Sequence, residues 1–475
     1  MCLSKRHVRA HMPDIAAQQL HADPRLAQAR QLIADALADA QQSIDQPRPA
    51  DPDQAQAYQQ ELDAFAKLRG GALPIPSLGS GLGKGPLVEL LDGSVKYDMI
   101  CGIGVHGLGH SDAGLINAGL DGALADAVMQ GNLQQNSESK ALCDDLVERA
   151  CRHGAKLEHC FLTTSGSMAN DNALKIIFQK HAPADRIMAF GKCFTGRTLA
   201  MASVTDKAAY RDGLPETIKV GYLPFYKPND LKKSIDSTIK HLDNYVRRYA
   251  GRVAGVMFEM IQGEGGYNAG DADYFKAVMS RCKELGLAVW VDEIQSFGRT
   301  SAPFAFQHYG LDQLVDVVSV GKMTQVCATL FTSDYNPRPG LISQTFTGAS
   351  SQIFAAREVL KRLDEAKVFG ADGLNMSYRK QFAEAIQAIH QRHPDKIDAD
   401  LFGEGSMIGF EVFNGDTDQT KAVMDRLYDL GVIAFLCGAD PLRLRFLPPV
   451  AVMRPGDVQA VCSLLEQTLV DVAEQ

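Results

Sequence analysis

The sequence has no run of apolar residues near the length of about 18 that a membrane-spanning helix needs, and it has no basic excess. Its 48 Lys and Arg residues are outnumbered by 57 Asp and Glu residues, which gives a net charge of −9. A protein that mainly binds nucleic acid normally carries a basic excess. The start of the chain is basic, but no apolar stretch follows it, as a secretory signal would require. The sequence therefore predicts neither a membrane protein nor a nucleic-acid-binding protein.

Cysteine pairs at CxxC spacing are also missing among the ten cysteines. Cys160 and Cys437 are flanked by apolar residues, which is typical of small buried side chains in a reducing compartment. We therefore expect a cytoplasmic location.

Internal repeats and low-complexity tracts are absent as well. A length of 475 residues exceeds what one core usually supports, and 45% hydrophobic with 22% charged residues is typical of globular proteins. Periodicity and glycine content divide the chain into a helical N-terminal extension at 1–70, the first part of a small domain at 71–111, a large α/β domain at 112–345 and a C-terminal part of the small domain at 346–475. A polar, proline-bearing break at 41–54 interrupts the extension.

The large segment alternates apolar strands with amphipathic helices. Strands are predicted at 159–164, 186–190, 253–261, 287–295 and 314–322, and helices at 141–154, 167–182 and 271–286. Continuous apolar strands alternating with helices indicate a mostly parallel sheet covered on both faces. Ligands of such sheets bind outside the carboxyl ends of the strands. Functional residues are therefore expected at those ends.

Three motifs are misleading. Gly102 to Gly107 matches GxGxxG, but a dinucleotide fold needs a helix to start inside that motif, and the following LGHSDAG is not expected to start one. The strand ending in Asp-Glu at 292–293 resembles that of a P-loop nucleotidase, but no GxxxxGK[ST] accompanies it. His106 and His110 are separated by glycines and lack a carboxylate cluster, so no metal site is expected.

Four polar features remain at predicted strand ends. They are the Ser165-Gly166-Ser167 turn before a helix, the Phe194–Thr198 turn with an arginine, Asp292 after five apolar residues, and Lys322 after a buried-type strand. Each has a structural alternative: a serine N-cap, a turn with an exposed arginine, a buried ion pair and a solvated lysine. Together they fit pyridoxal phosphate, which needs a phosphate cradle, a ring platform, an acid for its pyridine nitrogen and a lysine that forms a Schiff base.

With these residues in place, the chain resembles the class III (ω-amino-acid) aminotransferases of the type I pyridoxal-phosphate fold, over roughly 80 to 455. The strongest stretches are TTSGSMAND, FTGRT, FEMIQGEGG, VDEIQSFGRT, SVGKMTQVC and LRFLPP. The run KMTQVC is locally similar to lysine 6-aminotransferases. The resemblance implies a large domain with a mostly parallel sheet, a smaller α+β domain and a homodimer with shared active sites.

The resemblance also assigns the cofactor contacts. Lys322 would hold the cofactor and then move the substrate proton, Asp292 would keep the pyridine nitrogen protonated, and Gln295 would lie near the phenolic oxygen. The phosphate would be bound by Ser165, Gly166 and Ser167, the ring would stack on Phe194, and Thr345 would reach the phosphate of the neighbouring subunit.

The substrate contacts follow in the same way. Arg197 would hold one carboxylate and Arg445 the other, while Glu264 would neutralise Arg445 when the amino donor is bound. Glu259 matches the acidic residue that opens the family's EPIQGEGG-type motif. Arg443, on the same face of the strand, is an alternative partner for Glu264.

The chain departs from the family pattern at several positions. Met168 replaces a glutamate, Met260 a proline and Thr195 a histidine, and TFTGASS replaces a TFGGNP-like run. The predicted activity is transfer of an amino group, from an ω-amino acid or a diamine, to 2-oxoglutarate by a ping-pong mechanism, with pyruvate left open as acceptor. The alternatives are racemase, aminomutase or decarboxylase chemistry on the same cofactor, or an inert cofactor-binding relative.

Overall fold

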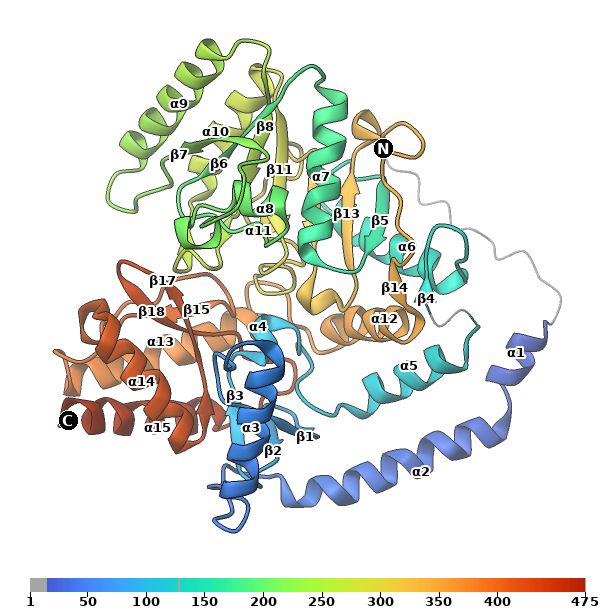
Figure 1. The fold of residues 1–475 in the computed structure, drawn as a ribbon, viewed down its shortest axis with the longest axis vertical. Helices are drawn as coiled ribbons and strands as arrows, with labels where there is room; N and C mark the ends of the chain where they lie inside the picture. The colour runs from blue at the N-terminus through green and yellow to red at the C-terminus, as the bar shows by residue number, and fades with distance from the viewer. Residues whose placement is uncertain (1–14, 127–128, 475) are drawn as a thin grey trace.

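The computed structural model describes residues 15–126 and 129–474. Figure 1 shows a large sheet wrapped by helices, a second body of small sheets and helices beside it, and N-terminal helices along the outside. None of the helices in the described part of the chain is long and apolar enough to cross a membrane.

The large sheet has seven strands in the order β5-β13-β12-β11-β8-β6-β7. All neighbours pair in parallel except those of β13, which is antiparallel to both β12 and β5. The mostly parallel sheet predicted from the sequence is therefore confirmed, whereas β13 and β7 had not been identified. The strands are β5 (His159–Thr163), β6 (Arg186–Phe190), β7 (Lys219–Leu223), β8 (Val253–Phe258), β11 (Ala288–Glu293), β12 (Val317–Val320) and β13 (Cys327–Phe331).

Helices cover both faces of this sheet because successive strand residues point to opposite sides. On β6, Ile187 and Ala189 pack in one apolar cluster, and Met188 and Phe190 pack in another. The first cluster includes α7 (Gly166–Lys180) and α8 (Leu199–Val204), and the second includes α6 (Ser137–Cys151), α9 (Leu231–Arg248), α10 (Ala272–Glu284) and α11 (Ala305–His308).

The second body joins the two halves of the chain. Strand β3 (Val95–Asp98) pairs in parallel with β16 (Val432–Ile433), and the hairpin predicted around Asp92-Gly93 links it to β2 (Leu87–Leu90). The remaining elements of this body are β1 (Gly79–Lys84), β15 (Ile408–Phe410), β17 (Phe435–Gly438), β18 (Leu442–Phe446), α13 (Leu374–Arg392), α14 (Thr417–Leu430) and α15 (Asp457–Ala473). The residue boundaries between the domains stay a prediction.

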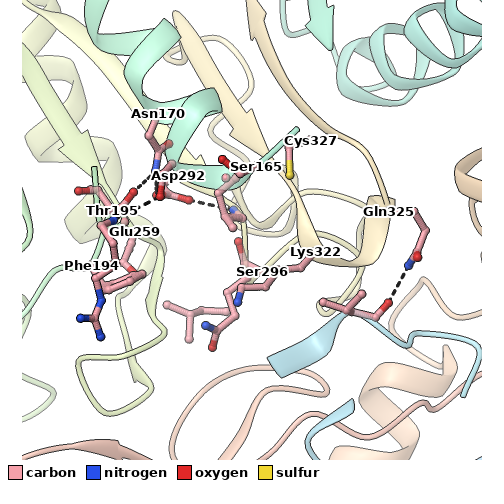
Figure 2. A pocket seen from close by; sticks show the side chains of 18 residues that line it. Ser165, Asn170, Phe194, Thr195, Glu259, Asp292, Ser296, Lys322, Gln325 and Cys327 are labelled. Carbon is pink, nitrogen blue, oxygen red and sulfur yellow. Dashed lines mark hydrogen bonds between the residues drawn. The ribbon is translucent and has the colours of Figure 1, made fainter. Parts of the chain in front are cut away.

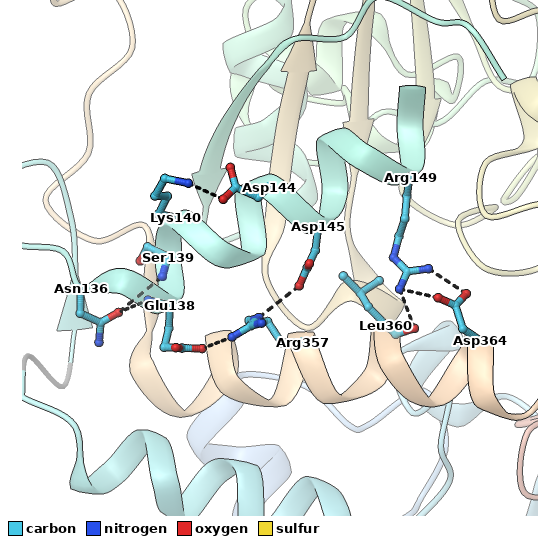
Figure 3. A network of polar contacts seen from close by, with 10 residues as sticks. All are labelled: Asn136, Glu138, Ser139, Lys140, Asp144, Asp145, Arg149, Arg357, Leu360 and Asp364. Atoms are coloured by element: carbon cyan, nitrogen blue, oxygen red, sulfur yellow. Dashed lines mark hydrogen bonds and ion pairs between the residues drawn. The ribbon is translucent and has the colours of Figure 1, made fainter. Parts of the chain in front are cut away.

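Helix α12 (Ser350–Glu365) is fixed to α6 by two arginines that point in opposite directions (Figure 3). Arg357 of α12 binds the carboxylates of Glu138 and Asp145 on α6. Arg149 of α6 binds Asp364 of α12 at 2.8 Å and donates to a backbone carbonyl of the same helix. These crossed ion pairs tie the helix that follows the large sheet back onto it.

The N-terminal extension contains the predicted helices, α1 (Ala16–His21), α2 (Pro24–Ala40) and α3 (Ala55–Arg69), and none of them has a buried residue. The predicted break between α2 and α3 is the part that packs against the rest of the protein. Ile44 is fully buried, and the Arg48 backbone pairs with Val95. Figure 1 shows α2 running beside α5 (Ala113–Leu124), to which Arg30 is joined by an ion pair with Asp121.

The GxGxxG run does not form a nucleotide-binding turn. It lies in a short turn, α4 (Cys101–Gly104), where Gly102 and Ile103 have left-handed backbone angles. One expectation was wrong: Asp112 caps α5, so a regular helix does start within LGHSDAG, although outside the motif. His110 binds Asp98 at 2.9 Å, and the described residues contain no cluster suited to a metal ion.

Short strands and 3-10 turns are the remaining elements of the described chain. They are β4 (Met129–Gln130), β9 (Ile261–Gln262), β10 (Asn268–Ala269), β14 (Gly348–Ala349), and the 3-10 turns η1 (Gln41–Ser43), η2 (Ala208–Tyr210), η3 (Lys322–Thr324), η4 (Ser333–Tyr335) and η5 (Phe413–Gly415).

Candidate active site

A cavity of about 350 Å³ opens at the carboxyl ends of the large sheet (Figure 2). Most of its lining comes from the carboxyl ends of β5, β6, β8, β11 and β12 and from the segments that follow them; Val105, which follows α4, and Cys327 of β13 complete it. It brings together nine of the residues selected from the sequence, namely Ser165, Gly166, Ser167, Phe194, Arg197, Glu259, Asp292, Gln295 and Lys322. The three others, Glu264, Thr345 and Arg445, do not line it.

Lys322 lies at the sharp turn between β12 and the antiparallel β13. Its φ of 54° is in the left-handed region, which costs a non-glycine residue on the order of 1–3 kcal/mol. The turn aims the side chain into the cavity (Figure 2). Burial lowers the pKa of the Lys322 ammonium, and the Glu264 carboxylate opposes that shift. A lysine with a lowered pKa is more often the neutral amine, which is the nucleophilic form.

Asp292, the penultimate residue of β11, is 6% exposed and still hydrogen-bonded at both oxygens. The backbone N–H of Ile294 donates to Oδ1 at 2.9 Å, and the side-chain amide of Asn170 donates to Oδ2 at 2.7 Å. Burial raises the pKa of Asp292 to about 6, against the lowering effect of these two donors. The carboxyl group is therefore held in one orientation, and burial shifts its ionisation to mildly acidic pH.

Helix α7 points its N-terminus into the cavity. Ser165 is its N-cap and accepts a hydrogen bond from Met168 N at 3.2 Å, so the structural alternative for this serine is correct. The same serine also lines the cavity together with Gly166 and Ser167. A Cβ atom on Gly166 would lie 2.9 Å from Ile294 Cγ2. Free backbone N–H groups at a helix start, beside serine hydroxyls, form a site for an anion such as phosphate.

Phe194 is held over the cavity by Glu259, at the end of β8. The Glu259 carboxylate accepts from Phe194 N at 2.8 Å and from Gly263 N at 3.1 Å, which joins two loops. Burial raises the pKa of Glu259 well above its ordinary value, and the nearby Asp292 adds to that shift. Glu259 therefore lines the cavity and also fixes the backbone of the loop that carries Phe194.

Arg197 lies at the rim and is exposed. Its backbone N–H donates to Ser167 Oγ at 3.3 Å, and its guanidinium lies 3.4 Å from the ring centre of Tyr210. Tyr210 also meets Phe194 edge to face, with ring centres 6.1 Å apart.

Glu264 and Arg445 form the ion pair predicted from the sequence. Arg445 Nη2 lies 2.8 Å from Glu264 Oε1, and the arginine side chain is fully buried. Burial lowers the pKa of Arg445 and the Glu264 carboxylate raises it, with a net shift upward. Gln295 of the cavity wall accepts from Arg445 at 3.2 Å. The alternative partner, Arg443, instead binds Glu411 at 2.8 Å.

Thr345 lies outside its own cavity. It is exposed on the segment that leads to β14. A Cβ atom on Gly131 would overlap the Thr345 carbonyl, at 1.8 Å, so the two segments touch. Exposure of this threonine leaves its side chain available to another molecule.

The chemical groups that line the cavity match those that bind pyridoxal phosphate. The cavity combines a helix N-terminus for a phosphate, a buried carboxylate for a protonated ring nitrogen, an aromatic ring and an amine with a lowered pKa. The side-chain oxygen of Asn170, which also lines the cavity, is buried without a hydrogen-bond partner among the described residues. This oxygen is therefore available to accept a hydrogen bond from a bound molecule.

Sequence reasoning missed two residues of this region, Asn170 and Tyr210. Asn170 lies inside α7 and donates both to Asp292 and to the Thr195 carbonyl, at 2.7 Å each. A buried asparagine one turn after the Ser-Gly-Ser run was a usable signal, because buried amides are hydrogen-bonded. Tyr210 belongs to η2 and carries no such signal.

Asn170 is expected to set the pH at which the site accepts the cofactor. Asp292 must be charged to hold a protonated ring nitrogen, so affinity should fall as the pH drops through its pKa of about 6. In Asn170→Ala the carboxylate loses one donor, its pKa rises, and this midpoint should move to higher pH. Affinity at neutral pH should weaken about tenfold or more, since a hydrogen bond to a charged group contributes about 1.5–3 kcal/mol.

Equilibrium titration of cofactor-free protein with pyridoxal phosphate, followed by absorbance from pH 5 to 8, measures both effects. Comparison with the unmodified chain cancels the titration of the cofactor itself. An unchanged midpoint in Asn170→Ala would contradict the role given to this amide.

Most of the chain is similar to known proteins. The sequence model described as "Aminotransferase class-III" matches residues 80–469. The acetylornithine aminotransferase of Methanocaldococcus jannaschii is 28% identical over 408 residues, covering 82% of this chain and 93% of the relative. The Bacillus subtilis acetylornithine aminotransferase is also 28% identical, over 398 residues, with 80% and 92% covered.

Solved structures show the same fold. A lysine aminotransferase from M. tuberculosis in its internal aldimine form superimposes with a TM-score of 0.75 at 20% identity, covering 86% of this chain and 99% of the other. An aminotransferase from Bacillus anthracis gives a TM-score of 0.77 at 20% identity, with 87% and 99% covered. The chain therefore belongs to the class-III aminotransferase family, as its motifs predicted, and it is a pyridoxal-phosphate-dependent aminotransferase.

Proposed function

We propose that this aminotransferase moves a terminal amino group from an ω-amino acid or a diamine to 2-oxoglutarate by a ping-pong mechanism. The observation that carries this proposal is the ion pair between Glu264 and Arg445. Arg445 of this pair donates a hydrogen bond to Gln295, which lines the cavity that holds Lys322. A site that must accept both a donor and a dicarboxylate acceptor needs a cation that can be covered and uncovered. The acetylornithine aminotransferases among the relatives support a donor with a terminal amine, and so do lysine and ornithine aminotransferases among the solved structures with the same fold.

The residues of the cavity would divide the work as follows. When bound, pyridoxal phosphate supplies an electron-withdrawing ring that acidifies the C–H bond beside the substrate nitrogen. Lys322 Nζ, whose pKa is lowered by burial, would take that proton and return it. Asp292 would hold a proton on the ring nitrogen, and the start of α7 with Ser165, Gly166 and Ser167 would bind the phosphate. Phe194 would pack on the ring face.

The ion pair would act as the switch. With Glu264 bound, the charge of Arg445 is compensated, which suits a donor with an apolar or cationic stem. With Glu264 displaced, the guanidinium is free to bind a carboxylate through two parallel hydrogen bonds. Arg197, at the rim of the cavity, would bind the other carboxylate. The alternatives on the same cofactor, racemisation, aminomutation and decarboxylation, need no such exchange of substrates.

The assembly and location belong to this proposal as well. Exposure of Thr345 supports a homodimer in which this threonine reaches the phosphate of the partner subunit. Six cysteines of the described chain are buried free thiols, which supports a reducing compartment, and we propose the cytoplasm; they are Cys101, Cys193, Cys282, Cys327, Cys437 and Cys462.

Lys322 and the donor are tested together. Holoenzyme mixed with a panel of diamines, ω-amino acids and α-amino acids should lose the absorbance of the lysine-bound cofactor only with true donors, and 2-oxoglutarate should restore it. Lys322→Ala should lose the borohydride-trappable linkage and turn over at least about 10²–10⁴-fold more slowly, the usual contribution of a positioned base. Racemised or decarboxylated product without a keto product would favour the alternatives.

The switch predicts opposite effects on the two half-reactions. Glu264→Ala should slow the donor half-reaction much more than the 2-oxoglutarate half-reaction. Arg445→Ala should raise the apparent binding constant of 2-oxoglutarate about ten- to a hundredfold, because a charge-assisted contact of about 1.5–3 kcal/mol is lost. Stopped-flow measurement of each half-reaction separates the effects. Arg443→Ala is the matched control, since this arginine is bound to Glu411. Equal losses in both halves for Glu264→Ala and Arg445→Ala would show that the pair is structural.

The shared site predicts complementation between two defective chains. Lys322→Ala removes the lysine of its own site, and Thr345→Ala should weaken cofactor retention in the partner's site. A mixed dimer then contains one site that lacks both residues and one that has both. Mixing the variants at limiting cofactor should therefore restore activity. If Thr345 served its own chain, the mixture would have no complete site, and activity would not recover.

A further inference from the structure

The loop that carries Arg197 is fixed through its backbone. Phe194 N donates to Glu259 at 2.8 Å, Thr195 N donates to Thr205 Oγ1 at 3.0 Å, and Arg197 N donates to Ser167 Oγ at 3.3 Å. Gly196 permits the close approach to α7, because a Cβ atom there would lie 2.1 Å from Ser167 Oγ and its φ is 130°. The backbone of this loop therefore has a defined place relative to the phosphate end of the cavity.

The guanidinium of Arg197, in contrast, is placed by one aromatic ring. Its Cζ atom lies 3.4 Å from the ring centre of Tyr210, and no carboxylate of the described chain forms an ion pair with it. The same ring meets Phe194 edge to face at 6.1 Å, and the Tyr210 hydroxyl accepts from Lys207 at 3.1 Å. Tyr210 thus connects the anion-binding arginine to the ring platform.

We propose that Tyr210 is a positioning residue that holds Arg197 ready for a substrate carboxylate at a fixed place relative to Phe194. This inference rests on the carboxylate-binding role proposed for Arg197. A tyrosine ring attracts a guanidinium through its negative face and covers only that face. The N–H groups at the guanidinium edge stay available for two parallel bonds to a carboxylate.

The physical reason is preorganisation. A long exposed arginine loses rotamer freedom when it binds, and that loss weakens the complex. Stacking on Tyr210 removes part of this freedom before the substrate arrives. An acidic partner would also fix the arginine, but it would compete with the substrate carboxylate, as Glu264 does at Arg445. An aromatic ring fixes the cation and leaves its charge uncompensated.

The test is direct binding of glutarate to the holoenzyme, measured by isothermal titration calorimetry. Glutarate has two carboxylates and no keto group, so it occupies the site without reacting. Tyr210→Ala should weaken its binding about three- to tenfold, as expected when one long side chain must be ordered during binding. Tyr210→Phe keeps the ring and should bind glutarate within about twofold of the unmodified enzyme. The cofactor absorbance of both variants should stay unchanged.

A matched control exists at the far end of β6. There Arg186 stacks on Tyr249 with a distance of 3.8 Å to the ring centre, and neither residue lines the cavity. Tyr249→Ala removes an arginine–tyrosine contact of the same kind and should leave glutarate binding unchanged. Equal weakening in Tyr249→Ala and Tyr210→Ala would reflect general destabilisation and overturn the inference.

A double-mutant cycle shows whether Tyr210 acts through Arg197. In an Arg197→Ala background, adding Tyr210→Ala should weaken glutarate binding no further. If Tyr210→Ala weakened glutarate binding in this background as much as it does in the unmodified enzyme, Tyr210 would act independently of Arg197, which contradicts the inference. If Arg197→Ala alone leaves glutarate binding unchanged, the proposed role of Arg197 fails as well. If Arg197→Ala weakens binding and Tyr210→Ala does not, the positioning role alone is wrong.

Discussion

The active site depends on placing a carboxylate and an amine at the ends of two neighbouring parallel strands. Asp292 lies near the end of β11 and Lys322 follows β12, and both strands are buried and mostly apolar. Parallel strands end at the same edge of a sheet, so the fold brings the two groups into one cavity although they are far apart in the sequence. Burial acts oppositely on them: it raises the pKa of the acid and lowers that of the amine. Burial therefore disfavours the charged form of both groups, and a ligand that pairs with either group would counter that effect.

The two arginines proposed to bind substrate are held by different means, and the difference has a chemical consequence. Arg445 is fully buried, so it needs the Glu264 carboxylate and the Gln295 oxygen beside it. Arg197 is exposed, so a ring suffices to hold it. An arginine paired with an acid can bind a second anion only after the acid moves, whereas an arginine on a ring can bind one at once. This asymmetry matches a site in which one end always meets a carboxylate and the other end meets it in only one half of the cycle.

The sequence predicted the parts of the site that follow strands and failed where contacts are made across the fold. The positions of Asp292, Lys322 and the start of α7 follow from apolar strands and the residues after them. Asn170 was missed because a buried position in a helix does not reveal which strand end it faces. Tyr210 was missed because its contact with Arg197 depends on the loop between β6 and β7 folding back. The antiparallel β13 begins soon after Lys322, because the chain reverses in a left-handed turn at that lysine. No residue pattern in the sequence predicts this turn, so β13 was missed as well.

The departures from the family pattern can be understood from which atoms make the contacts. Thr195 replaces a histidine, yet the group of this residue that supports Asn170 is its backbone carbonyl, which any side chain leaves in place. Met168 replaces a glutamate, and its contribution to the cap of α7 is its backbone N–H. Met260 replaces a proline and is fully buried next to Glu259. Because Thr195 and Met168 contribute only backbone atoms to these two contacts, their side chains can change while the contacts remain.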